Sequence, residues 1–221
     1  MDLYKQFVLF VLVLNVSAMD LVDDPVYQRM AAALESKTDR DPNDDLRLAG
    51  IYSDARQYDK SEALYLKHVA VADRYPVIYA NLSVSAGKQA KYAEAIEWAD
   101  KALSAAQRIL AVNPHAAVDL MHPVLVKASW LWESGKQVEA KALFASVAVP
   151  GVGDSEESTY WGCRACFYGS VGDQTELTAA IGKCLDLAGS QMVTFIRRDI
   201  VFDRYRTEPW FIKLVGITRT P

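Results

Sequence analysis

The chain is poor in the residues on which most enzyme and metal chemistry depends. It has three histidines and three cysteines among 221 residues, and its few glycines fall mostly at predicted turns. The motifs G-x-S-x-G and H-E-x-x-H, the P-loop and the glycine-rich dinucleotide fingerprint are all missing from the sequence. A catalytic interpretation has no residues to support it, so we expect a protein that is not an enzyme and carries no cofactor.

The chain also lacks an excess of positive charge. Its net charge is −4 and its pI is near 5.4, whereas a general nucleic-acid binder needs a basic face for phosphate contacts. Acids dominate residues 20–45 and bases lead residues 197–213. We interpret this split as solvated faces and helix ends, with head-to-tail contact between copies as the alternative.

No apolar run is long enough to cross a bilayer, which needs about 20 residues. The longest is Phe7–Leu14, which follows Lys5 and precedes the small-residue pattern Val16-Ser17-Ala18. This order is typical of a signal peptide. We predict cleavage after Ala18 and an exported chain, periplasmic or secreted, that is not inserted in a membrane. The alternatives are an uncleaved anchor or a true start at Met19.

The middle of the chain is organised as pairs of short amphipathic segments. From Leu46 to Val69, apolar residues recur at helical spacing in two runs separated by a polar turn near Gln57. Asp59, followed three residues later by Glu62, predicts a capping box at the start of the second helix. Neither helix is long enough to be stable alone, so we expect each pair to stack.

The same design recurs three more times, at intervals of 34, 45 and 37 residues. Corresponding positions are the small residue of the second helix, the bulky residue one turn later, and the small residue of the first helix. These positions are Ser61, Ala95, Ala140 and Leu177; Tyr65, Ala99, Phe144 and Ile181; and Ala49, Ser83, Ala128 and Ala165.

These positions resemble the tetratricopeptide repeat (TPR) family, best in Leu48, Ala49, Tyr52, Ser61 and Tyr65. The resemblance implies an all-α, right-handed solenoid of about four helical hairpins plus capping helices. The segment 199–211 is similar to the end of many bacterial TPR arrays, in which it covers the last hairpin. The family binds proteins or peptides in a concave groove, so the resemblance implies a scaffold for protein–protein interaction.

We therefore divide the chain into a signal peptide (1–18), a leading helix and linker (19–42), four TPR-like helix pairs (43–188) and C-terminal capping helices (189–221). The leading helix should begin at Asp24-Pro25 and end near Ser36, and Asn43 should cap the next helix. The second helix of repeat two should be long and end at Asn113. Pro150-Gly151-Val152-Gly153 should be a break, with Asp154 capping the next helix. We expect Gly189-Ser190 to end the fourth hairpin before a separate helix over 191–198 and a short helix after Pro209.

The TPR resemblance also implies which side chains line the groove. In repeats two and three they are Asn81, Val84, Lys88, His122, Leu125, Ser129, Trp132 and Glu133. Trp132 lies beside Trp130, so one of the two should point away from the core and could anchor a partner. The alternative is that Trp132 packs on the neighbouring repeat. Only Asn81 matches the clamp with which some TPR proteins hold a carboxylate, which argues against that ligand.

Other chemistry-bearing residues have structural interpretations. In an exported chain, Cys184 could form a disulfide with Cys163 or Cys166 across antiparallel helices. A redox or metal role for the C-x-x-C pair is the weaker alternative, because the pair lies inside a predicted helix. The acids of 39–45 lack the glycine and the final glutamate of a calcium loop. His115 and His122 have no further ligand at zinc spacing. For the protein as a whole, a self-associating structural module is the alternative to a scaffold that binds a partner.

Overall fold

The computed structural model describes residues 25–113, 120–146, 155–198 and 200–216. Within these ranges the chain forms α-helices and two short 3-10 helices and no strand, so the all-α prediction is confirmed. The first half contains α3 (Pro25–Glu35), α4 (Pro42–Asp54), α5 (Tyr58–Lys67), η1 (Val69–Val71), α6 (Val77–Lys88) and α7 (Tyr92–Val112). The second half contains α8 (Met121–Glu133), α9 (Gln137–Ala145), α10 (Ser155–Val171), α11 (Gln174–Arg198), η2 (Ile200–Tyr205) and α12 (Pro209–Leu214).

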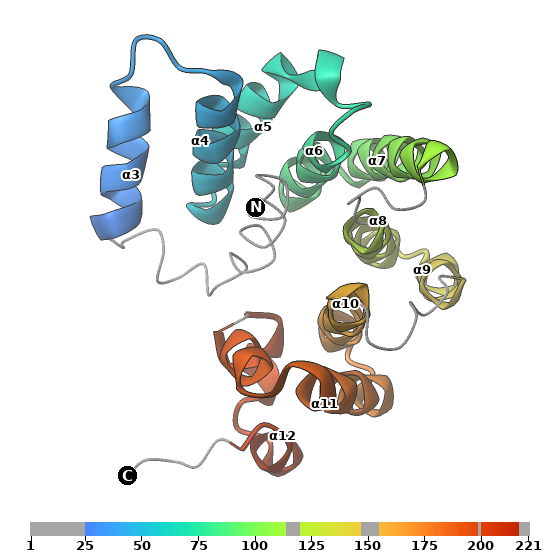
Figure 1. The fold of residues 1–221 in the computed structure, drawn as a ribbon. Helices are drawn as coiled ribbons and strands as arrows, with labels where there is room; N and C mark the ends of the chain where they lie inside the picture. The colour runs from blue at the N-terminus through green and yellow to red at the C-terminus, as the bar shows by residue number, and fades with distance from the viewer. Residues whose placement is uncertain (1–24, 114–119, 147–154, 199, 217–221) are drawn as a thin grey trace.

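The helices follow one another around an open arc (Figure 1). Each of α3 to α8 packs on the helix that follows it, and α10 packs on α11. α8 also contacts both α6 and α10. Figure 1 shows α4, α6, α8 and α10 on the inner side of the arc and α5, α7, α9 and α11 on its outer side. No described helix has both the length and the apolar character required to cross a membrane.

Four helix pairs are closed by the same backbone turn. The chain enters the left-handed region at Arg56 (φ 57°), Ala90 (φ 60°), Gly135 (φ 87°) and Gly172 (φ 83°). At each turn the next amide donates to a carbonyl five residues earlier, as in Gln57 to Tyr52 at 2.8 Å, which closes the end of a helix in a Schellman motif. Each turn residue lies five residues before one of the repeat positions Ser61, Ala95, Ala140 and Leu177. The turns therefore recur at the same intervals as the sequence pattern.

Local signals placed several helix ends correctly. The leading helix occupies Pro25–Glu35, where Met30, Ala31 and Leu34 pack toward the first pair. α7 continues to Val112, with Asn113 as its C-cap. α12 begins at Pro209, the position that favours proline in a first turn.

Three local predictions were wrong. Asp41, and not Asn43, caps α4, because its carboxylate accepts from the amide of Asp44 at 2.8 Å. The Asp59 capping box does not form, because α5 already begins at Tyr58, directly after the left-handed turn. α11 is continuous from Gln174 to Arg198 and is not broken at 189–190. The predicted Asp154 cap and the break at 150–153 lie outside the described residues.

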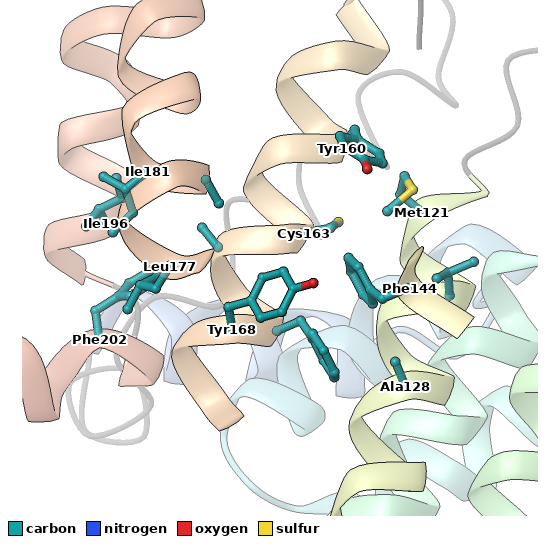
Figure 2. Packing of buried hydrophobic residues seen from close by; sticks show 14 of the residues in the cluster. Met121, Ala128, Phe144, Tyr160, Cys163, Tyr168, Leu177, Ile181, Ile196 and Phe202 are labelled. Atoms are coloured by element: carbon teal, nitrogen blue, oxygen red, sulfur yellow. The ribbon is translucent and has the colours of Figure 1, made fainter. Parts of the chain in front are cut away.

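The core consists of three clusters along the arc. The N-terminal cluster comprises Leu34, Leu48, Ala49, Ile51, Leu64, Tyr65, Ala72, Ile78 and Leu82. A small junction cluster contains Ala86, Ala95, Val126 and Trp130. In the large C-terminal cluster (Figure 2), Tyr160, Cys163 and Tyr168 of α10 lie between Met121, Ala128 and Phe144 on one side and Leu177, Ile181 and Ile196 on the other.

The C-terminal segment packs directly on α10. Phe202 and Phe211 are fully buried in the C-terminal cluster. The hydroxyl of Tyr205 donates to the carbonyl of Gly169 at 3.0 Å, and the Arg204 guanidinium donates to the carbonyl of Ser170 at 2.9 Å. The end of the chain therefore covers the last helix pair with both apolar and polar contacts.

Candidate functional site

The predicted groove residues all lie on α6 and α8, two neighbouring helices on the inner side of the arc (Figure 1). Lys88 and Glu133 are exposed, and Val84, Leu125 and Trp132 are half-buried. His122 and Ser129 are also half-buried. We call the set Val84, Lys88, Leu125, Ser129, Trp132 and Glu133 the inner face.

Asn81 differs from the other predicted residues because its side chain is buried. Its Nδ2 donates to the Tyr65 hydroxyl at 3.0 Å, which links α6 to α5. Only 8 % of the residue is exposed. Asn81 therefore belongs to the packing between helices, and in this arrangement it is not available to a partner.

The two tryptophans of α8 have different environments. Trp130 is buried, and its Nε1 donates to Ser83 Oγ at 3.1 Å. Its ring lies so close to Gly87 that a Cβ added there would be 2.2 Å from Trp130 Cε2. Trp132 is only half-buried, with its ring edge-on to Phe167 of α10 at 6.4 Å between centroids. Thus Trp130 is a core residue, while Trp132 both packs on the neighbouring pair and keeps an accessible surface.

The remaining inner-face side chains have local interactions that hold them in place. Ser129 Oγ donates to the Leu125 carbonyl of its own helix at 2.9 Å. The Lys88 ammonium lies 6.0 Å from the centre of the Trp130 ring. Leu125 packs against the edge of the C-terminal cluster. Half of the inner-face residues are therefore apolar, and the set has no net charge, with one cation on α6 and one anion on α8.

The three cysteines are thiols in this structure, with no disulfide joining Cys184 to Cys163 or Cys166. Cys163 and Cys184 are buried, and Cys166 is half-buried. Burial raises the pKa of the Cys184 thiol to about 12. Since the thiolate is the reactive form, Cys184 behaves as a small apolar core residue in this arrangement.

The acids in the first turn of α4 are bound by protein groups. Lys37 Nζ lies 2.9 Å from Asp44 Oδ1, and its hydrogen bond lowers the pKa of that carboxyl. Asp45 lies 2.9 Å from Arg40 Nε and 3.2 Å from His68 Nε2. Within the described ranges, no three His, Cys, Asp or Glu side chains gather as a metal site would require. His115 lies outside those ranges.

Two polar features were not predicted from the sequence. The Arg164 guanidinium donates to the hydroxyls of Tyr160 and Tyr168 at 2.9 Å and 3.1 Å and to Glu176 at 3.0 Å. The spacing of the two tyrosines, four residues before and after Arg164 on α10, is the signal that could have found this network. The second feature is Asp54, a carboxyl at the end of α4 whose Oδ2 is buried with no hydrogen-bond partner.

Known proteins add nothing that would identify these features, since no family model, curated protein or solved structure matches the chain.

Proposed function

We propose that this protein is a TPR-like solenoid that binds another protein or a peptide on its inner face. The observation that carries the proposal is the regular alternation of helices along the arc. The first helix of each pair lies on the inner side and the second on the outer side (Figure 1). The four left-handed turns repeat with the same spacing as the sequence pattern.

The composition of the inner face supports a protein or peptide ligand. Trp132, Leu125 and Val84 offer partly exposed apolar surface on two adjacent helices. Aromatic side chains with a rigid, partly exposed ring are frequent anchors in protein interfaces. Because Lys88 and Glu133 carry opposite charges, recognition of the partner should depend on apolar contact and shape more than on net charge.

Photo-crosslinking can test which side of the arc contacts the partner. A crosslinking amino acid replaces the exposed Glu133 on α8 or the exposed Val138 on α9. The full chain is then exposed to an extract of the source cells. We expect a partner adduct from position 133 and none from position 138. Adducts of equal yield at both positions would contradict binding on the inner face.

A matched pair of tryptophan variants tests the anchor. Trp132→Ala and Trp98→Ala each remove a half-buried indole that contacts one aromatic ring, Phe167 for Trp132 and Tyr79 for Trp98. With the captured partner, Trp132→Ala should weaken binding at least about tenfold, while Trp98→Ala on the outer helix α7 should have little effect. Equal affinities would place the site elsewhere. A dimer in light scattering with no partner would favour self-association.

Export is a separate proposal that rests on residues 1–18, outside the described part of the chain. Mass spectrometry of the native protein from cell fractions should find a mature chain that starts at Met19. The oxidising exterior would also allow a bridge from Cys184 to Cys163 or Cys166. Counting thiols with and without reductant after denaturation measures that bridge. A cytosolic protein that keeps residues 1–18 would refute the proposal of export.

A further inference from the structure

Asp54 is placed where a carboxylate is electrostatically disfavoured. It is the last residue of α4, and the last turn of that helix contains no basic residue. The C-terminal end of a helix carries partial negative charge, which repels an anion and favours a cation. The chain then turns sharply through Arg56, whose side chain is exposed.

One oxygen of the Asp54 carboxyl group has no partner within the protein, although the residue as a whole is half-buried. Its Oδ2 is buried and accepts no hydrogen bond, and none of the ion pairs formed by the described residues includes it. Asp44 and Asp45, in the first turn of the same helix, both have cations beside them. Gln57 Oε1 is a second buried acceptor without a donor. The region therefore has more acceptors than donors, a balance that a protonated carboxyl would improve.

Asp54 of α4 lies near two tyrosines of α5, and one of these tyrosines links α5 to α6. Tyr58 and Tyr65 of α5 both interact electrostatically with Asp54. The Tyr65 hydroxyl is held by Asn81 of α6, and it would lie 3.9 Å from a Cβ added to Gly50 of α4. Arg56 acts on Tyr58, but no cation contributes to the pKa of Asp54. Burial alone raises the pKa of this carboxyl from 3.8 to about 7.

We propose that Asp54 is a pH-sensitive joint between the first helix pair and α6. When the carboxyl is protonated it stays buried, and α4, α5 and α6 pack together. When it ionises, an uncompensated charge lies at the C-terminal end of α4, and the packing opens so that water can also reach the buried Oδ2. The joint acts on the fold of this chain and needs no partner.

The direction of the effect follows from proton linkage. The packed state holds its proton to a higher pH than the opened state, in which the carboxyl has its ordinary pKa. The stabilisation of the packed state by this proton is therefore fully present below the ordinary pKa of an aspartate, and it is lost as pH rises toward 7. Between about pH 6 and about pH 8 the opening equilibrium should increase about tenfold.

Hydrogen exchange of the full chain measures this opening directly. After correction for intrinsic exchange rates, amides of α4 and α5 should lose protection about tenfold from about pH 6 to about pH 8, while those of α10 and α11 should not. Asp54→Asn, which is isosteric and cannot ionise, should abolish the difference. Asp59→Asn, which neutralises an exposed acid in the first turn of α5, should leave the pH dependence intact.

Either of two results would overturn the proposal that Asp54 is a pH-sensitive joint. One is an α4–α5 protection that does not change with pH in the wild type. The other is a pH dependence that persists in Asp54→Asn, since another group would then be responsible. Urea unfolding of the same variants shows whether each is folded at both pH values, so a collapsed variant cannot be mistaken for an opened joint.

Discussion

The two ends of the arc are stabilised in different ways. Tyr65 is the one aromatic side chain buried in the N-terminal cluster, whereas Phe144, Tyr160, Phe167, Tyr168, Phe202, Tyr205 and Phe211 are all buried in the C-terminal cluster. Both ends have ion pairs, but the acids of the first pair are the more buried. Asp44 and Asp45 of α4 have side chains 12 % and 13 % exposed, against 46 % for Glu176 beside Arg164. The first region should therefore depend more on its charged side chains, and the second more on the volume of its buried side chains.

The backbone turns of the N-terminal and C-terminal halves also differ in the residues that they use. The first two pairs place the non-glycine residues Arg56 and Ala90 in the left-handed conformation, whereas the last two use Gly135 and Gly172. A side chain at such a position costs about 1–2 kcal/mol relative to its usual conformation. The N-terminal half thus has a smaller aromatic core and more strained turns, and we expect it to be the less stable half.

The largest expected effect is in the C-terminal cluster. Phe167 is fully buried and stacks on Phe144 with 4.6 Å between ring centroids. Phe167→Ala should lower the free energy of unfolding by about 3–5 kcal/mol, because it removes an aromatic ring from a packed core. Urea denaturation measures this loss. Val138→Ala, at a site 84 % exposed, serves as the control and should change stability by less than about 0.5 kcal/mol.

The next largest loss of stability is expected in the junction cluster, where Gly87 of α6 lies against Trp130 of α8. Gly87→Ala would place a methyl group within the Trp130 ring, and overpacking of this kind costs about 1–3 kcal/mol. Tryptophan fluorescence during urea unfolding should show the loss. Gly162→Ala is the matched control, because that helical glycine has open space at its Cβ position. It should be neutral or stabilising by up to about 1 kcal/mol. A Gly87→Ala variant as stable as the control would mean that Trp130 is not tightly held.

Exchanging turn residues should move the two halves in opposite directions. Gly135→Ala introduces a side chain at φ 87° and should cost about 1 kcal/mol. Ala90→Gly relieves the strain at φ 60° and should stabilise by a smaller amount, because glycine also gains freedom in the unfolded chain. Thermal unfolding of the two variants and of the double variant measures both changes. Shifts of the same sign would contradict our comparison of the turns.

Salt should produce the smallest difference. Raising the NaCl concentration from about 0.02 M to about 1 M screens partly exposed ion pairs, each worth up to about 1 kcal/mol. Hydrogen-exchange protection of α3 to α5 should fall slightly. Lys37→Met removes the cation beside Asp44 and should reduce this salt sensitivity. An equal salt sensitivity in the wild type and in Lys37→Met would contradict a contribution of this ion pair.

The predicted site was only partly determined by sequence spacing. Spacing along a helix indicates which residues share a face, and the eight groove residues all lie on the two neighbouring helices α6 and α8. It does not show whether a polar side chain on that face meets another helix. Asn81 is buried because Tyr65 of α5 lies beside it, and that meeting depends on how two helix pairs stack.

Helix periods, the four-fold repeat and the positions of Pro25 and Pro209 at helix starts were determined by the sequence alone, because they depend on neighbours within a few residues. The continuity of α11 was decided by the tertiary structure. A helical glycine costs about 1 kcal/mol, less than is gained by burying Ile196 with Ile181 in the C-terminal cluster. The environment of Asp54 was likewise decided by packing, because burial and the lack of a cation arise only when α4, α5 and α6 meet.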